Sequence, residues 1–98
     1  MGPRFHPGAL ADFTEAHEWY LDVDIDVAAT FRRALEQAIE RIQSNPERWP
    51  LQRNGARACR VGSFPYSIHY SHSDEQVTII ALAHHRRRPG WFSKRLAD

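Results

Sequence analysis

The first half of the chain repeats its apolar residues with the period of an α-helix. The helical pattern begins at Ala9 and continues to an acidic stretch, DVDID, at 22–26. One face of this first predicted helix carries Leu10, Phe13, His17, Tyr20 and Leu21. The acidic stretch breaks the pattern, and Asp24 or Asp26 is placed to cap a second helix by accepting backbone N–H groups.

The second predicted helix has the clearest apolar stripe in the sequence. Its apolar positions recur at steps of three and four residues: Ala28, Phe31, Leu35, Ala38 and Ile42. The helix ends in SNPERWP at 44–50, because Asn45 precedes Pro46 and a residue before proline avoids the helical region. Two helices with so short a connection form an antiparallel hairpin, and each needs a second surface to cover its apolar stripe.

Strand patterns in the second half supply that surface. The predicted strands are ARACRVGS (56–63), FPYSIHYS (64–71) and VTIIALA (77–83), with a possible edge strand RFH (4–6). In the middle strand the large residues alternate with polar ones, so one face carries Phe64, Tyr66, Ile68 and Tyr70 and the other carries Ser67, His69 and Ser71. VTIIALA is almost wholly apolar, which is typical of a central strand.

The order of these elements predicts an α+β fold. We expect an N-terminal helical hairpin packed on a three- to four-stranded antiparallel sheet, with residues 1–98 forming a single domain. Short turns between consecutive strands favour the antiparallel arrangement. The tail WFSKRLAD at 91–98 has room for one or two helical turns after the Pro-Gly break.

Composition excludes several classes of protein. No stretch approaches the roughly 18 apolar residues of a membrane helix, and the N-terminal MGPRFHPGAL lacks the apolar region of a secretory signal. The single cysteine, Cys59, has no internal partner for a disulfide, which fits a reducing compartment. We therefore expect a cytoplasmic protein that does not bind a membrane.

Charge is unevenly distributed between the two halves. Residues 1–49 carry nine acids and five bases, whereas residues 50–98 carry three acids and eight bases. Twelve of the thirteen bases are arginines, and Lys94 is the single lysine. An arginine-rich region is suited to binding phosphate or carboxylate groups, which the guanidinium fork contacts in pairs.

Metal, cofactor and nucleophile motifs are absent from the sequence. The six histidines do not form a metal-ligand spacing, and adjacent His84 and His85 should point to opposite faces of a strand. Cys59 has the basic neighbours Arg57 and Arg60 but no catalytic motif around it, which favours a small core residue. The sequence has no Gly-rich phosphate loop. We expect neither a metal nor a cofactor.

The stretch HHRRRPGWF at 84–92 is the strongest candidate site. It follows the most apolar strand and gathers His84, Arg86, Arg87, Arg88, Trp91 and Phe92. Arg53, Arg57 and Arg60 should lie on or near a neighbouring strand. Such a surface can hold a phosphate backbone and stack a base, or bind an acidic peptide. Alternatively, the two rings cover the sheet edge and the arginines are solvated. Trp19, Tyr20 and Trp49 are expected in the core or at its edge.

Four stretches in fixed order resemble one family of proteins. They are HPGALADFTEAHEWY at the first helix, FRRALEQAIERIQSNPERWP across the second, CRVGSFPYSIHYS in the middle and ALAHHRRRPGWFSKR near the end. Over nearly its whole length the chain resembles type II toxins of the RelE/ParE superfamily, on the ParE or plasmid-stabilization side. The resemblance implies a helical hairpin on a twisted antiparallel sheet, and a cognate antitoxin that wraps the toxin with a disordered segment.

The resemblance leaves three activities open. A ParE-like toxin inhibits DNA gyrase by binding it, and its contact surface here would be formed by Arg57, Arg60, His84, Arg86, Arg87, Arg88, Trp91 and Arg95. A RelE-like toxin cleaves mRNA in the ribosome, and Arg60, His84 and Arg86 would be its catalytic candidates. This chain lacks the C-terminal tyrosine and paired lysines of such nucleases, which favours the first activity. The third possibility is a non-toxic relative that only binds its antitoxin.

Partner expectations follow from the same resemblance. An acidic, amphipathic antitoxin segment would satisfy both the arginines and the apolar surface of the hairpin. The resemblance also allows a homodimer or a heterotetramer with the antitoxin.

Overall fold

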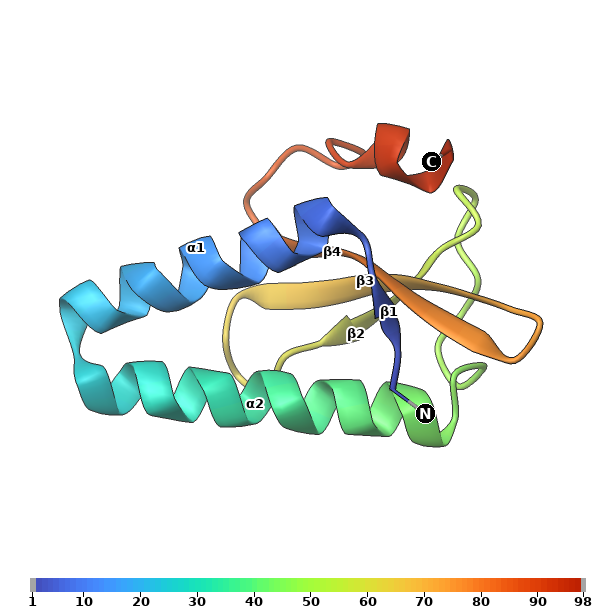
Figure 1. Ribbon diagram of the computed structural model, residues 1–98. Helices are drawn as coiled ribbons and strands as arrows, with labels where there is room; N and C mark the ends of the chain where they lie inside the picture. The colour runs from blue at the N-terminus through green and yellow to red at the C-terminus, as the bar shows by residue number, and fades with distance from the viewer. Residues whose placement is uncertain (1, 98) are drawn as a thin grey trace.

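A helical hairpin lies along one face of a four-stranded sheet in the computed structural model, which describes residues 2–97 (Figure 1). The elements in chain order are β1 (Arg4–Phe5), α1 (Pro7–Val23), α2 (Ile25–Ser44), β2 (Arg57–Arg60), β3 (Tyr66–Ser73), β4 (Gln76–His84) and the 3₁₀ helix η1 (Ser93–Ala97). This arrangement confirms the predicted α+β fold with its helices at the N-terminal end. It also confirms helical turns in the tail.

The helix boundaries follow from local capping. α1 begins at Pro7 rather than Ala9, because the Nδ1 atom of His6 accepts the N–H of Gly8 at 2.9 Å and proline is tolerated in a first turn. A single residue, Asp24, separates the helices. Its own N–H closes α1 on the carbonyl of Tyr20 at 2.8 Å, and its Oδ1 atom caps α2 by accepting the N–H of Asp26 at 2.7 Å.

The sheet is mixed, which corrects the prediction of a purely antiparallel one. Its strand order is β1-β4-β3-β2, and β2, β3 and β4 form the expected antiparallel meander. β1 pairs in parallel with β4, Arg4 opposite Thr78 and Phe5 opposite Ile79. Both helices and two strands intervene between β1 and β4, so no short turn forces these two strands to run in opposite directions. β4 is central, as its composition predicts.

The main core lies between the helices and the sheet. Its largest fully buried side chains include Phe31 and Ile42 from α2, Tyr70 from β3 and Ile79 from β4. The apolar face predicted for α1 is partly wrong. Ala9, Ala16 and Tyr20 are its buried residues, whereas Leu10 is 52% exposed and Leu21 is 44% exposed. Two alanines on the buried side let α1 approach the sheet closely, and the larger leucines lie outside.

A register shift in β4 gives this strand two buried faces. Tyr70 pairs with Ile79 but His69 pairs with Ala81, so Ile80 is an extra residue in β4. Ile79 lies before this bulge and Leu82 after it, and both belong to the core under the helices. Ile80 and Ala81 instead pack against Phe92 on the opposite face, which we call the outer face.

The C-terminal segment covers the outer face and a free edge of β4. β1 is only two residues long, so β4 has no strand neighbour beyond Ile79 on that side. The Leu82 N–H donates instead to the carboxylate of Asp12 at 3.1 Å, and the Ile80 carbonyl accepts from the guanidinium of Arg95 at 3.2 Å. An ion pair between α1 and the tail therefore replaces a strand partner along this edge.

Candidate functional site

Residues Arg86–Arg88, which we call the arginine turn, follow directly after β4. The turn is fixed by its own backbone: the Arg86 N–H donates to Nδ1 of His84 at 3.0 Å and the Arg87 N–H donates to the His84 carbonyl at 3.0 Å. All three arginines are exposed. The guanidinium groups of Arg86 and Arg88 make no hydrogen bond or ion pair within residues 2–97. They are therefore available to an anionic partner.

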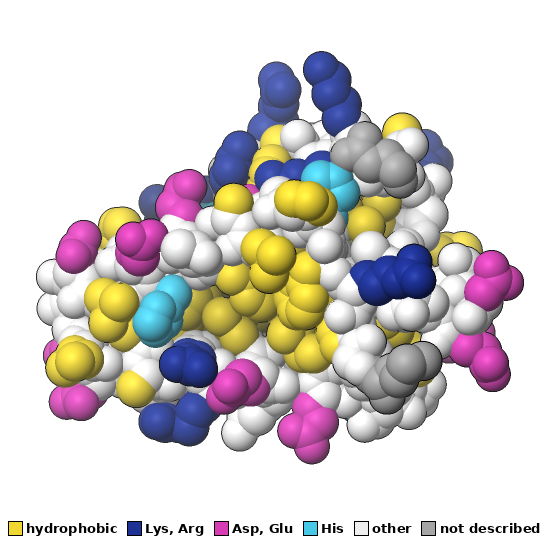
Figure 2. All heavy atoms as spheres, in the orientation of Figure 1, with side chains coloured by type: hydrophobic (Ala, Val, Ile, Leu, Met, Phe, Trp, Pro, Cys, Tyr) yellow, Lys and Arg dark blue, Asp and Glu magenta, His cyan; other side chains and the backbone are white. Residues whose placement is uncertain are grey.

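Basic side chains gather around the C-terminal segment. Figure 2 shows dark blue side chains projecting from the top, where Figure 1 draws the C-terminal segment. Magenta side chains follow the upper helix, α1. Several basic side chains of the second half thus gather near the C-terminal segment, although dark blue side chains also occur lower on this face, and the gathering favours attraction of an anion there.

The two rings after the turn have different environments. Trp91 is half-buried, and the guanidinium carbon of Arg87 lies 3.8 Å from the centre of its ring. That contact occupies part of the ring surface that a base would stack on. Phe92 is buried and lies 4.6 Å from the His69 ring, centre to centre, so it covers the sheet as the alternative interpretation predicts.

Arg95 is used inside the protein. Its guanidinium contacts both oxygens of Asp12, at 2.6 and 3.3 Å, and the two side chains are only 20% and 14% exposed. The tail lies so close to α1 that a Cβ atom on Gly8 would come within 2.5 Å of this guanidinium. A bidentate, mostly buried pair of this kind holds the tail in place. It separates Arg95 from the arginines that a partner can reach.

The two arginines of β2 lie at opposite ends of the strand. Arg57 pairs with Tyr70, and its Nη1 atom donates to the carbonyls of Trp49 at 2.6 Å and Glu47 at 3.3 Å, so it anchors the loop before β2. Arg60 pairs with Ser67, whose own partner on β4 is Ala83. Arg60 is exposed at the same end of the sheet as the arginine turn.

His84 and His85 point to opposite faces of the sheet, as predicted. The His84 ring meets Tyr66 edge-on at 5.0 Å, on the helix side. His85 lies on the outer side, where its Nε2 atom is 2.9 Å from the Oγ atom of Ser67. Arg60, the cross-strand partner of Ser67, shares that outer side. Two of the three nuclease candidates, Arg60 and His84, therefore lie on opposite faces of the sheet.

The Ser67–His85 contact is a feature that the sequence reasoning missed. Its signal was present in the alternation of the middle strand, which already placed Ser67 and His69 on the face opposite the large residues. His69 lies next along this face, and burial, with a smaller contribution from His85, lowers the pKa of its imidazole. Its Nδ1 atom is buried and has no hydrogen-bond partner within the described residues. The outer face thus combines a serine, two histidines and an arginine.

None of the three tyrosines joins this face. Tyr20 and Tyr66 pack with Phe31 and Phe64 under the helices, and burial raises the pKa of both phenols. The Tyr70 hydroxyl donates to the Pro46 carbonyl, and burial raises its pKa to about 12. A phenol that could exchange a proton near neutral pH is therefore missing from the outer face of the described chain.

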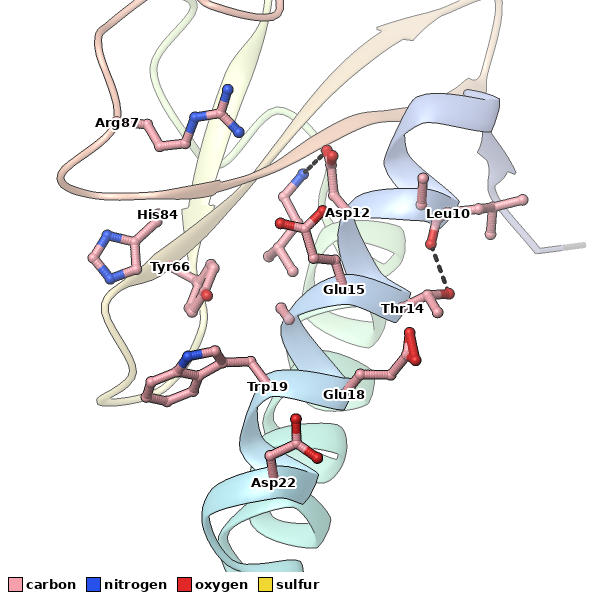
Figure 3. A pocket seen from close by; sticks show the side chains of 13 residues that line it. Leu10, Asp12, Thr14, Glu15, Glu18, Trp19, Asp22, Tyr66, His84 and Arg87 are labelled. Atoms are coloured by element: carbon pink, nitrogen blue, oxygen red, sulfur yellow. Dashed lines mark hydrogen bonds between the residues drawn. The ribbon is translucent and has the colours of Figure 1, made fainter.

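A groove runs along the exposed side of α1, and we call it the α1 groove. It has a volume of about 740 Å³ and opens toward the arginine turn (Figure 3). Its lining is formed by Leu10, Ala11, Asp12, Thr14, Glu15, Ala16, Glu18, Trp19, Asp22, Tyr66, Leu82, His84 and Arg87. Trp19 was expected in the core or at its edge; it is 60% exposed in this groove, and its ring packs against that of Tyr20. Tyr20 is buried and Trp49 packs against Tyr70, as predicted.

Cys59 is a core residue, as its lack of a motif predicts. It is fully buried, and burial raises the pKa of its thiol even though the guanidinium of Arg41 lies 3.7 Å from its sulfur. In residues 2–97 no three histidine, cysteine or acidic side chains are grouped closely enough to hold a metal ion. None of the described helices is both long and apolar enough to cross a membrane.

Comparison with known families assigns the chain to a class of protein. Residues 4–89 match the family described as ParE toxin of type II toxin-antitoxin system, parDE. The match includes both helices, all four strands and the arginine turn. The chain therefore belongs to this toxin family. It is the toxin of a type II toxin-antitoxin system and has an antitoxin partner. Among curated proteins no match was found.

Proposed function

We propose that this toxin acts by binding DNA gyrase, with the arginine turn as the centre of its contact surface. The observation that carries this proposal is the pair of exposed guanidinium groups at Arg86 and Arg88, which make no hydrogen bond or ion pair within residues 2–97. Family membership supports a toxin, and resemblance to ParE-like proteins points to gyrase as the target. Arg60 at the same end of the sheet extends the cationic surface.

The proposed contact surface contains fewer residues than the sequence suggested for it. Arg86, Arg88 and Arg60 are its exposed cations, while Arg87 and Trp91 form a stacked pair beside them. His84 faces the α1 groove on the other side of the turn. Arg57 and Arg95 stabilise the protein from within. The target and the antitoxin compete for the exposed cations, which explains how an antitoxin neutralises the toxin.

A supercoiling assay tests the proposal. Purified toxin is expected to inhibit gyrase, and reversing charge at Arg86→Glu and Arg88→Glu is expected to weaken inhibition by at least about tenfold, since close charge pairs at interfaces contribute several kcal/mol. The matched control is Arg32→Glu with Arg33→Glu, two exposed arginines on α2. Gyrase that supercoils DNA normally in excess toxin contradicts the proposal. Equal loss of inhibition in both variants would show that only net charge matters.

A second candidate, ribosome-dependent mRNA cleavage, is favoured by one observation. The Ser67–His85 contact lies beside Arg60, so a proton-transfer group and a phosphate-binding group share the outer face. On this hypothesis His85, rather than His84, moves the proton. The missing phenol makes it the weaker candidate. Translation extracts supplied with the toxin distinguish the two: mapped mRNA ends that disappear in His85→Ala, with gyrase unaffected, would support cleavage.

Partner and location follow from the toxin class. The antitoxin is expected to be an adjacent gene product whose acidic residues contact the arginine turn. We place both proteins in the cytoplasm, where gyrase and ribosomes work, and we expect either a one-to-one complex or a heterotetramer. If expression neither damages DNA nor stops translation while the antitoxin still binds, the chain is a non-toxic relative.

A further inference from the structure

We infer that the α1 groove binds a segment of the antitoxin that is apolar and positively charged, adjoining the acidic stretch that covers the arginine turn. This inference rests on the proposed pairing with an antitoxin and adds a site and a charge order to it. The groove begins at the turn itself, because Arg87 and His84 line one end of it. A single continuous segment can therefore contact both surfaces.

The groove has an acidic wall whose carboxylates have no ion-pair partner within the described chain, and Arg87 lies at one end of the lining. Glu15, Glu18 and Asp22 from α1 line it, and none of the three makes an ion pair or hydrogen bond through its carboxylate within residues 2–97. Asp12 differs, because Arg95 already neutralises it. The charge that a partner meets on this wall is therefore negative, and lysine or arginine is its complement.

The same groove exposes aromatic surface. Trp19 is 60% exposed although its ring packs edge-on against that of Tyr20, with the ring centres 5.0 Å apart. Figure 3 shows Trp19, Tyr66 and His84 along one side of the groove, with the carboxylate of Glu15 nearby on α1. Burial raises the pKa of the Tyr66 phenol, and Tyr20 and then Glu15 add smaller contributions. An apolar side chain flanked by cations would cover this surface, and Trp is the residue type most enriched at binding hot spots.

The groove fits a short segment rather than a second folded domain. Its lining runs from Leu10 to Asp22, a rise of about 18 Å along α1. That length accommodates about three helical turns or five to six extended residues. The antitoxin should thus carry acidic residues where it meets the arginine turn and, next to them, a stretch with lysine or arginine around an aliphatic or aromatic side chain. The sequence suggested an acidic, amphipathic segment, and the acidic part of such a segment would be repelled from this wall.

Affinity for the purified product of the adjacent gene tests the inference. Trp19→Ala is expected to weaken binding about thirtyfold, the effect of losing a hot-spot residue. Glu15→Lys with Asp22→Lys is expected to weaken it about tenfold, and more at low salt than at high salt. The matched control, Glu36→Lys with Glu75→Lys, makes the same charge change at exposed positions outside the groove and should bind like wild type.

Restoration of affinity gives the most specific result. Changing the antitoxin's own lysine or arginine to glutamate should recover binding to the Glu15→Lys, Asp22→Lys toxin. Circular dichroism and the thermal midpoint verify that each variant folds. Wild-type affinity in both groove variants overturns the inference while leaving the toxin–antitoxin pairing intact. A wild-type toxin that forms no complex with the adjacent gene product overturns both.

Discussion

Two sets of arginines in the same half of the chain have opposite environments. The guanidinium groups of Arg86 and Arg88 are exposed and make no hydrogen bond or ion pair within the described residues, whereas those of Arg57 and Arg95 bind internal carbonyls and a carboxylate. The difference arises from position. The arginine turn extends beyond the end of β4, whereas Arg57 faces backbone carbonyls of the loop before β2. Arg95 faces an edge of β4 that β1 is too short to cover. An arginine-rich sequence therefore does not by itself identify a binding surface.

The largest expected effect is on the internal ion pair. Arg95→Ala leaves the mostly buried Asp12 carboxylate unpaired and removes the hydrogen bond to the Ile80 carbonyl. We expect the free energy of unfolding to fall by about 3 kcal/mol, measured by urea denaturation. Lys94→Ala, at the exposed neighbouring position, is the control. If both variants unfold at the same urea concentration, the proposed contrast between buried and exposed arginines fails.

A smaller loss is expected at β2. Arg57→Ala removes two hydrogen bonds from a charged donor, to the carbonyls of Trp49 and Glu47. We expect the free energy of unfolding to fall by about 1.5 kcal/mol, with faster hydrogen exchange in the loop before β2. Gyrase inhibition by the folded variant should be unchanged. A folded Arg57→Ala protein with lost inhibition would move Arg57 into the contact surface.

The outer face predicts a modest pH dependence of stability. Burial lowers the folded-state pKa of His69 below its ordinary 6.5, so the unfolded chain binds more protons between the two values. The free energy of unfolding should therefore decrease as pH falls from about 7 through 6.5 toward the folded-state pKa. His69→Leu should reduce this slope in urea denaturation at a series of pH values. An identical slope in the variant would show that His69 is not its source.

The smallest stability effect should occur at the arginine turn. Arg86→Ala with Arg88→Ala removes exposed side chains that make no hydrogen bond or ion pair within the described residues, so the thermal midpoint should stay at its wild-type value. Gyrase inhibition and antitoxin affinity should nevertheless fall. A lowered midpoint would reveal an internal role for the turn and would remove the distinction between the two sets.

Much of the fold could be predicted from periodicity because its signals are local. The stripe from Ala28 to Ile42, the Asn45–Pro46 stop and the alternation in 64–71 each depend on neighbouring residues, and the structure has all three. The buried face of α1 was harder to predict from the sequence, because its alanines contribute little to an apolar pattern. Trp19 was expected in the core or at its edge, yet most of its side chain lies outside the buried side of α1.

The candidate site was predictable as a stretch but not as an arrangement. The sequence placed His84 and the three arginines together at a strand end. The structure adds that the three arginines are exposed and that His84 is half-buried. Arg60 and His84 do not share a face, because their partners on β3, Ser67 and Tyr66, are consecutive residues that point to opposite sides of the sheet. Ser67 and His85 meet only through pairing of β3 with β4.

The amino-acid sequence by itself determined the helical hairpin, the three-stranded meander and the toxin family, because each depends on the order and spacing of residues along the chain. Tertiary structure alone decided the parallel pairing of β1, the opposite roles of Arg88 and Arg95, and the groove beside Trp19. These features join residues that are far apart in the chain. They form because certain strand edges and carboxylates have no partner once the core has packed. No local sequence pattern indicates which groups these will be.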